Sequence, residues 1–293
     1  MANKKKLTIS IVNYNAGDYL LRCLASIEKV SDEISLKVIV IDNASVDDSI
    51  DIAKKKFNDV EFIMNDENVG FGKAHNQVLK ELDTEYVLIF NPDCQLEKGT
   101  LKYMIEFMDA HENVGVSTSK LEKDNGEMDI ASHRGFPTPW ASFKYYFLKD
   151  DSLYHLTDRD MTKTHEVDAV VGAFFLTRKS VLEKVGYFDE DYFMYAEDLD
   201  LCMRIKKAGY KIMYVPEVKT MHHKGISTGI KQLTSEQSKA STETRKKMTG
   251  YFYSTMKLFY KKHYANQYPF FINWLVYLGI DVKWWMARRK LTV

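Results

Sequence analysis

The chain has 293 residues, of which 45% are hydrophobic, so it is long and apolar enough to bury a substantial core. It carries 41 Lys/Arg and 41 Asp/Glu, and this balance argues against a nucleic-acid partner. The three cysteines are far apart and form no CxxC pair. This spacing indicates neither a disulfide framework nor a zinc knuckle, and it favours a reducing, cytoplasmic compartment.

The first third of the chain alternates between strand-like and helix-like segments. Continuous apolar runs predict buried strands, and amphipathic spacing predicts helices between them. Such units form right-handed βαβ crossovers and a mostly parallel sheet, in which ligands bind beyond the carboxyl ends of the strands. The predicted strands are 7–12, 36–41, 60–64, 86–90 and 114–118, and the predicted helices are 17–29, 46–57, 72–82 and 98–110.

The middle of the chain is less regular. Residues 119–166 lack clear periodicity, and we interpret them as an irregular insertion that faces the substrate. Regular patterns return after residue 166. They predict strands at 167–176 and 211–215, helices at 178–185 and 196–208, and helical structure from about 234 to the end.

The charge is unevenly divided along the chain. Residues 231–293 hold 12 Lys/Arg and 3 Asp/Glu, whereas residues 1–230 hold 29 and 38. We therefore predict a main domain at 1–230 and a basic, aromatic helical region at 231–293. Its most apolar stretch, 269–290, is interrupted by charged residues and suits a helix lying on an anionic membrane surface. The alternative is a helix packed on the body or on a second copy in a homodimer.

Polar residues gather where four of the predicted strands end. The clusters are NYN (13–15), DNAS (42–45), NDENVGFG (65–72) and NPDC (91–94). Asn, Asp, Ser and Gly are also common in ordinary turns, so any one cluster alone is weak. Four clusters at one edge of a sheet favour a ligand site.

The motifs exclude several ways of binding phosphate. The sequence has no GxxxxGK[ST] loop and no GxGxxG after the first strand. A bound nucleotide would therefore need a divalent cation, Mg²⁺ or Mn²⁺, held by carboxylates. Asp93, placed after Pro92 at the end of a buried strand, suits that purpose. The alternative is that Asp93 caps the following helix.

Two later clusters could carry chemistry. Glu197, Asp198 and Asp200 lie at the start of a predicted helix. They could simply favour the helix dipole, or one could accept a proton from a hydroxyl. His222 and His223, followed by Lys and Gly, suit a metal ligand or a phosphate contact.

The ordered set of motifs resembles family 2 glycosyltransferases of the GT-A fold, and it is most similar to the bacterial rhamnosyltransferase branch. The resemblance covers roughly residues 7–227 and rests on VIVIDNAS, NVGFGKAHN, NPDC, the long VGAFFLTRKS to IMYVP segment, and HHKG. NPDC is similar to that branch's form of the DxD motif, with Asn91 in place of the first acid. The expected fold is therefore α/β of the GT-A type with a C-terminal helical extension.

The resemblance implies roles for individual residues. Asp198 is expected to be the general base of an inverting transfer, and Glu197 and Asp200 to position the acceptor or the helix. Asp93 is expected to bind the Mg²⁺ or Mn²⁺ ion, helped by His222 or His223. The residues expected to bind the donor are Asn13, Asn15, Asp42, Asn43, Gly70, Phe71, Gly72, Asn76 and Asn91.

The resemblance also implies substrates and a location. The expected donor is dTDP-β-L-rhamnose, and the expected acceptor is a lipid-linked or polysaccharide glycan at the inner face of the cell membrane. A UDP-hexose or UDP-HexNAc donor is the main alternative. A sugar-phosphate nucleotidyltransferase and a membrane-associated scaffold without catalysis rank lower.

Overall fold

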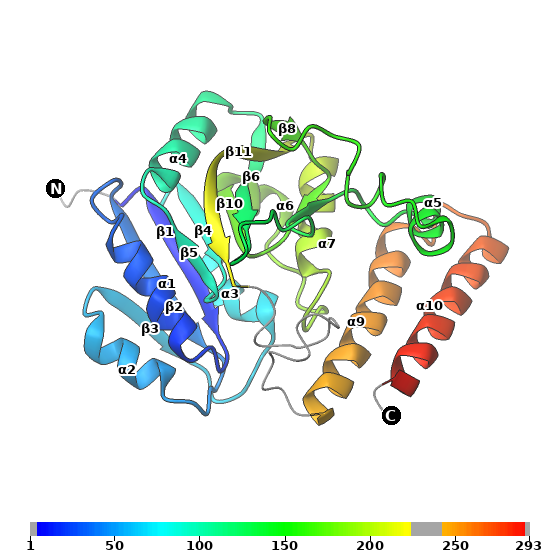
Figure 1. Cartoon of the computed structure of the whole chain (residues 1–293), viewed down its shortest axis with the longest axis horizontal. Helices are drawn as coiled ribbons and strands as arrows, with labels where there is room; N and C mark the ends of the chain where they lie inside the picture. Colours follow the sequence, from blue (N-terminus) through cyan, green and yellow to red (C-terminus); the bar gives the residue numbers. More distant parts are fainter. Residues whose placement is uncertain (1–4, 224–241, 291–293) are drawn as a thin grey trace.

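A mixed β-sheet forms the centre of the computed structural model, which describes residues 5–223 and 242–290 (Figure 1). Within these residues the main sheet has nine strands, in the order β3-β2-β1-β4-β10-β6-β11-β5 with β8 paired to β11, and β7 and β9 form a separate ribbon. The strands are β1 (Leu7–Asn13), β2 (Leu36–Asp42), β3 (Val60–Met64), β4 (Tyr86–Phe90), β5 (Cys94–Leu96), β6 (Val114–Glu122), β7 (His133–Arg134), β8 (His165–Glu166), β9 (Ala169–Val170), β10 (Phe174–Arg178) and β11 (Lys211–His222). The helices are α1 (Asp18–Glu28), α2 (Ser49–Lys56), α3 (Phe71–Leu79), α4 (Thr100–Ala110), α5 (Pro139–Phe143), the π-helix η1 (Lys144–Leu148), α6 (Lys179–Val185), α7 (Glu197–Lys207), α9 (Thr242–His263) and α10 (Phe270–Lys290).

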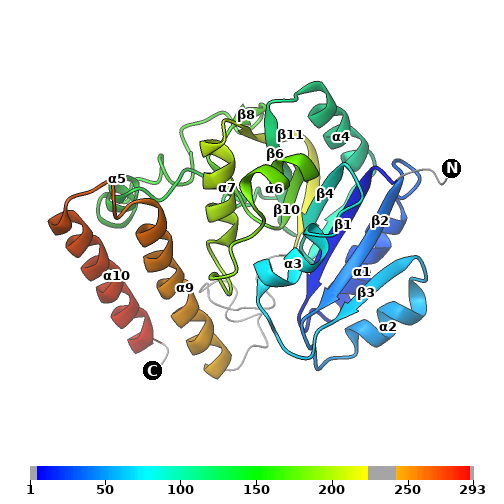
Figure 2. The ribbon, with the colours of Figure 1, turned by 180° about the vertical axis from the view of Figure 1, so that it is seen from behind.

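The sheet separates two hydrophobic cores, because successive side chains of a strand point to opposite faces. In β4, Leu88 and Phe90 enter one core, and Val87 and Ile89 enter the other. The first core is covered by α1, α2 and α4, and the second by α3, α6, α7 and α9. Figure 2 shows the second set of helices from behind. This arrangement confirms the predicted α/β class with a mostly parallel sheet.

The predicted strand 167–176 is wrong in one respect. It divides into β9 and β10, and the residues between them turn at Gly172. β10 then runs antiparallel between β4 and β6, which are not neighbours in the sheet. An apolar run contains no information about strand direction, so the sequence could not indicate this insertion.

β11 is much longer than the predicted strand 211–215 and continues to His222. Pro216 directly follows the predicted strand, and proline cannot donate a ladder hydrogen bond. The structure accommodates Pro216 in a register shift of the β6–β11 pair between Val215 and Lys219. His222 is therefore the last residue of a strand, whereas the sequence suggested a loop.

The segment 119–166 contains more structure than its lack of periodicity predicted. β6 extends to Glu122, and α5 and η1 form two consecutive turns of helix. Thr138 caps α5, since its hydroxyl accepts a hydrogen bond from the Ala141 N–H at 3.1 Å, and Pro139 occupies the first turn.

Two long helices, α9 and α10, form the C-terminal part of the described chain and lie side by side next to α7 (Figures 1 and 2). Phe259, Tyr260 and Tyr264 of α9 are buried in the second core. Among the described residues, no helix combines the length and apolarity needed to cross a bilayer. The predicted boundary at residue 230 lies outside the described residues and stays a prediction.

Candidate functional site

Asp93 and His222 face each other at the edge where β4 ends and β11 ends. The Asp93 carboxylate and the His222 Nε2 are 3.7 Å apart, and the Cys94 thiol lies close to both. The other ring nitrogen of His222, Nδ1, is 3.1 Å from the buried Asp129 carboxylate. A carboxylate at this position fixes the orientation of an imidazole, as it does for histidines that bind metals. Asp129 and Cys94 were not predicted as site residues from the sequence.

His223 does not join this group. Its ring contacts Gln95 at 2.6 Å and forms an ion pair with Asp124, and it lies 5.5 Å from the ring of Tyr19. Its backbone N–H donates to the Asp93 carbonyl oxygen at 2.9 Å. Successive residues of a strand point to opposite sides, so only one of the two histidines can face Asp93. The rest of the predicted HHKG motif, 224 and 225, lies outside the described residues.

The polar residues at the ends of β1 and β2 bind to one another. The side-chain amide of Asn13 donates to Asp42 at 2.8 Å and to Ser45 at 3.0 Å. Asp42 also accepts hydrogen bonds from the hydroxyl and the N–H of Ser45, at 2.6 and 3.0 Å. Asn15 holds the same turn, because its side chain accepts from the Val46 N–H at 2.8 Å. Asp42 is 2% exposed, so its carboxylate mainly organises this wall of the site.

A second set of bonds ties the loop before α3 to β2. Asn43 donates to the Gly70 carbonyl at 3.1 Å and accepts from the side chain of Asn65 at 2.9 Å. Gly70 has φ +91°, and a Cβ there would lie 2.4 Å from the Phe193 carbonyl oxygen. Only glycine fits this close approach, which brings the start of α3 against the segment that leads to α7.

Two predicted donor residues are occupied by protein contacts. Asn76 is buried and holds the backbone of Phe188 through both side-chain atoms, at 2.9 and 3.0 Å. The Phe71 ring packs over Gly172 and edge-on to His75 at 4.5 Å. Both residues therefore hold the neighbouring segments in place, and their predicted contribution to donor binding stays a prediction.

The remaining donor residues also serve close packing. A Cβ at Gly72 would lie 2.9 Å from the Cβ of Phe188, which again favours glycine. Asn91 begins the NPDC turn, and its carbonyl accepts from the Cys94 N–H at 3.1 Å.

The backbone just before α7 is strained. Tyr195 and Ala196 have φ of +72° and +67°, a backbone region that residues other than glycine rarely adopt. Consecutive residues of this kind cost free energy and often occur at functional sites. The strained turn ends directly at Glu197 and Asp198, so it sets the direction in which these two acids leave the backbone.

Asp198 is held by a backbone group and lies near the half-buried Arg134. Its carboxylate accepts a hydrogen bond from the Leu199 N–H at 2.7 Å, and the Gly172 backbone is near enough to lower its pKa. Burial raises the pKa of Asp198, and the positive charge of Arg134 and these backbone groups only partly oppose that rise. A raised pKa makes a carboxylate a better proton acceptor near neutral pH. Arg134, which also donates to the Tyr154 hydroxyl at 3.2 Å, was not predicted from sequence.

Asp93 and Asp198 approach the same short segment from two sides. The Ala173 carbonyl accepts a hydrogen bond from the Asn91 N–H at 3.3 Å, and Asn91 begins the turn that carries Asp93. The backbone of the neighbouring Gly172 is near enough to Asp198 to lower the pKa of its carboxyl group. The turn between β9 and β10 therefore connects the two acids, which lie at the same edge of the sheet.

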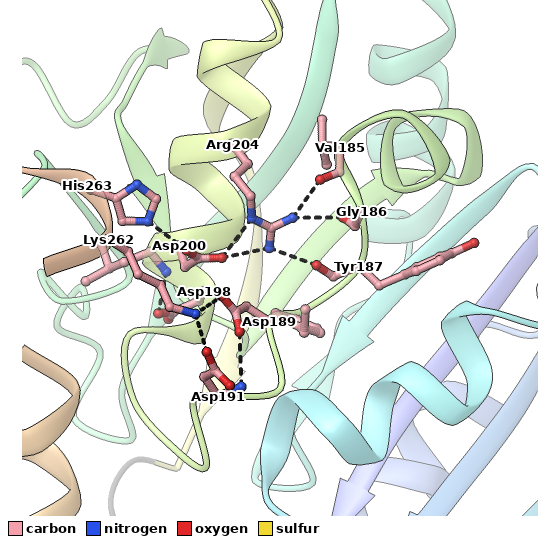
Figure 3. Close-up of polar contacts among 12 residues, drawn as sticks. Val185, Gly186, Tyr187, Asp189, Asp191, Asp198, Asp200, Arg204, Lys262 and His263 are labelled. Atoms are coloured by element: carbon pink, nitrogen blue, oxygen red, sulfur yellow. Dashed lines mark hydrogen bonds and ion pairs between the residues drawn. The ribbon is translucent and has the colours of Figure 1, made fainter. Parts of the chain in front are cut away.

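Asp200, in contrast, is a structural residue. Its buried carboxylate contacts His263 at 2.7 Å and Arg204 at 2.7 Å (Figure 3). Arg204 also donates to the carbonyls of Val185, Gly186 and Tyr187, as Figure 3 shows.

Helix α9 reinforces this arrangement. Lys262, next to His263, forms ion pairs with Asp189 at 2.5 Å and Asp191 at 2.6 Å. Lys262 and His263 therefore fasten α9 to the segment that leads into α7 and to α7 itself. Asp200 therefore positions the helix that carries Asp198, one of the two roles predicted for it.

Replacing Glu197 by glutamine is expected to change how stability depends on pH. Burial, followed by the nearby charge of Asp198, raises the pKa of Glu197. Above the ordinary glutamate pKa of about 4.3, the folded state therefore binds more protons than the unfolded state, and the free energy of unfolding falls as pH rises. Glu197→Gln removes this titration. The melting temperature of the variant minus that of the wild type should therefore increase as the pH rises from about 5 to about 8. Thermal unfolding across this range tests it, and parallel pH profiles for the two proteins would contradict it.

The sequence matches two descriptions of known families. Residues 8–186 match "Glycosyl transferase family 2", and residues 113–287 match "Glycosyl transferase family group 2". Each match spans more than half of the chain and together they include both acids of the candidate site.

Proteins of known activity have similar sequences. N-acetylglucosaminyl-diphospho-decaprenol L-rhamnosyltransferase of Mycobacterium tuberculosis is 28% identical over 76% of this chain and 78% of its own length. Rhamnosyltransferase WbbL of Escherichia coli is 28% identical over 73% of this chain and 82% of its own length. Poly-beta-1,6-N-acetyl-D-glucosamine synthase of Staphylococcus aureus is 26% identical over 72% of this chain, which spans 51% of that protein.

Solved structures with a similar fold are larger. S. aureus TarS 1–349 in complex with UDP-GlcNAc superimposes with a TM-score of 0.55 and 22% identity, over 83% of this chain and 64% of that one. Mannosyltransferase PcManGT from Pyrobaculum calidifontis, in complex with GDP-Man and Mn²⁺, has a TM-score of 0.55 and 17% identity over 85% of this chain and 62% of its own. These structures confirm the predicted GT-A fold.

Proposed function

This chain belongs to glycosyl transferase family 2, as its motifs predict, and from that premise we propose that it is an inverting rhamnosyltransferase. The enzyme moves L-rhamnose from dTDP-β-L-rhamnose to a hydroxyl of a lipid-linked or polysaccharide acceptor. The observation that carries this proposal is the turn at Gly172 and Ala173, which connects the proton acceptor Asp198 with the turn that bears Asp93.

Asp198 acts as the general base in this proposal. The acceptor hydroxyl loses its proton to Asp198 as its oxygen attacks the anomeric carbon from the face opposite the nucleotide, and the nucleotide diphosphate leaves. The Leu199 N–H and the charge of Arg134 orient the carboxylate, so it meets the hydroxyl without rearrangement. Glu197, whose pKa burial raises, stays protonated beside it and adds no second negative charge.

Asp93 and His222 suit a divalent cation, which we propose to be Mg²⁺ or Mn²⁺. Their facing atoms are 3.7 Å apart, too far for a hydrogen bond, and Asp129 holds the imidazole in that orientation. The Asp93 carboxylate suits these hard ions and the His222 imidazole adds a weaker ligand, whereas the Cys94 thiol is a soft ligand that they bind poorly. A cation bound here supplies positive charge to the donor diphosphate. Asn13, Asp42 and Asn43 hold the strand ends against which the nucleotide lies.

The similar proteins favour two different nucleotide-sugar donors. Two of them are rhamnosyltransferases by name, and this favours dTDP-rhamnose. The TarS complex contains UDP-GlcNAc, and the synthase makes a polymer of N-acetyl-D-glucosamine, and these favour a UDP-HexNAc donor.

A thermal-shift panel of nucleotide sugars, with and without Mn²⁺, separates the two donors. We expect dTDP-rhamnose with Mn²⁺ to raise the melting temperature most, because a ligand that binds only the folded state stabilises it by RT ln(1 + [L]/Kd), so at equal concentration the ligand with the lowest Kd stabilises most. dTDP alone and UDP alone serve as controls for the nucleotide. A larger shift with UDP-GlcNAc than with dTDP-rhamnose would establish the alternative.

We also propose that the enzyme works on the cytoplasmic side of the membrane, bound to its surface. The mycobacterial relative acts, by name, on a diphospho-decaprenol, which is a lipid. The basic residues of 231–293 suit an anionic lipid surface. An acceptor attached to lipid would then meet the enzyme at that surface.

A further inference from the structure

Helix α10 is apolar on two opposite faces, and only one of them is covered. Asn273 and Tyr277 pack on Tyr260 of α9, and Ile280 is buried on the same side. The other face remains exposed, although its large apolar side chains recur every three or four residues over an arc of roughly 120°. They are Phe271, Trp274, Leu275, Leu278, Val282 and Trp285.

The segment α5–η1 lies beside α10 and exposes a second set of apolar side chains. Figures 1 and 2 both place α5 next to the α9–α10 pair, and Lys283 of α10 lies 4.4 Å from the ring centre of Tyr146 in η1. Trp140, Phe143 and Phe147 stack on one another, yet they are 60%, 44% and 70% exposed. Clusters of exposed apolar side chains on a protein surface mark an interaction site.

The charges beside these faces identify the partner. Arg288 and Arg289 lie over the rings of Trp284 and Trp285, at 5.3 and 3.7 Å. The single acid of α10, Asp281, is paired with Lys257 at 2.5 Å, so the surface is positive. Tryptophan and tyrosine with basic neighbours are the composition that settles at the boundary of an anionic bilayer. A second copy docked through the same face would bring like charges together.

We propose that α5–η1 and the outer face of α10 form one surface that binds an anionic lipid bilayer and receives a lipid-attached acceptor. This inference rests on the proposed function and adds the second lipid-binding element, α5–η1, which the sequence analysis assigned to substrate. A series of contacts joins that element to the site. Tyr145 of η1 lies 5.1 Å from the ring of Tyr154, whose hydroxyl accepts a hydrogen bond from Arg134, and the charge of Arg134 acts on Asp198.

Vesicle flotation with the full chain tests the proposal. The wild type should float with vesicles of phosphatidylglycerol and phosphatidylcholine in equal parts, and much less with phosphatidylcholine alone. Trp140→Ser combined with Phe147→Ser leaves α10 intact, and it should weaken binding at least about tenfold, because two exposed aromatic anchors are lost. Val46→Ser with Met64→Ser is the matched control. Both residues are exposed. Val46 precedes α2 and Met64 is the last residue of β3, and these two elements lie at the opposite end of the molecule from α10 (Figure 1).

Each outcome decides the question. Wild-type flotation with the α5–η1 variant unchanged would show that α10 acts alone and overturn the inference. A wild-type dimer, detected by light scattering and lost in the same variant, would show that a second copy covers the surface. Donor binding in solution is measured in parallel on all proteins. If the wild type binds the donor but does not float with vesicles, only the lipid surface is refuted. If the wild type floats but binds no nucleotide-sugar donor, only the proposed enzyme activity is refuted.

Discussion

Asp198→Asn is expected to reduce sugar transfer by about 10²- to 10⁴-fold, the range that a positioned general base contributes. Asparagine keeps nearly the same shape and can still accept from the Leu199 N–H that holds Asp198, but it cannot accept the proton of the acceptor hydroxyl. Donor affinity should remain nearly unchanged, because the base meets the acceptor and not the nucleotide. Initial rates with saturating donor, together with calorimetry of donor binding, separate the two effects.

Asp191→Asn is a matched control for this substitution. Asp191 is an exposed acid seven residues earlier, paired with Lys262 at 2.6 Å and not linked to Gly172. Its loss should leave the rate of transfer unaltered. Turnover of Asp198→Asn within about twofold of the wild type would remove Asp198 from the role of base, since a loss that small is far below the effect of a general base.

The regular parts of the fold were predictable because their signals are local. β1, β2 and β4 are continuous apolar runs, and the helices between them show amphipathic spacing, so their positions agree with the prediction to within a few residues. The position of β10 between β4 and β6 depends on pairing between distant segments, and no local pattern encodes that. β5 was missed because three residues are too short to show a period.

The site was predictable where chemistry is concentrated in a motif. The NPDC turn and the acids before α7 were found, because carboxylates after a buried strand or at a helix start are visible in the sequence. Asp129 and Arg134 were missed because both lie in a segment without periodicity. Their roles depend on contacts with distant residues, Asp129 with His222 and Arg134 with Asp198. The signal that could have found Arg134 is an arginine directly before the apolar, proline-containing segment GFPTPW.

Asp93→Ala is expected to lower donor affinity when the cation is present and to preserve or raise it when the cation is absent. With Mn²⁺, Asp93→Ala should abolish the metal-dependent part of donor affinity, because His222 alone is a poor site for a hard cation. Asp129→Asn, which only frees the imidazole that Asp129 orients at 3.1 Å, should weaken Mn²⁺ binding by the roughly 10- to 100-fold typical of such partners. Asp93→Ala should therefore lose more than Asp129→Asn. Calorimetric titration of Mn²⁺ and of donor measures both losses.

Without a divalent cation the expected order reverses. Asp93 then places a negative charge next to the diphosphate, so Asp93→Ala should bind the donor as well as the wild type or better when EDTA is present. Asp124→Asn is the matched control, since Asp124 is an exposed acid near the same edge that pairs with His223 and not with His222. An Asp93→Ala protein that loses donor affinity equally with Mn²⁺ and with EDTA would mean that Asp93 supports the fold of the NPDC turn and holds no metal. A crossover between the two conditions cannot arise from misfolding, because misfolding would lower donor affinity in both.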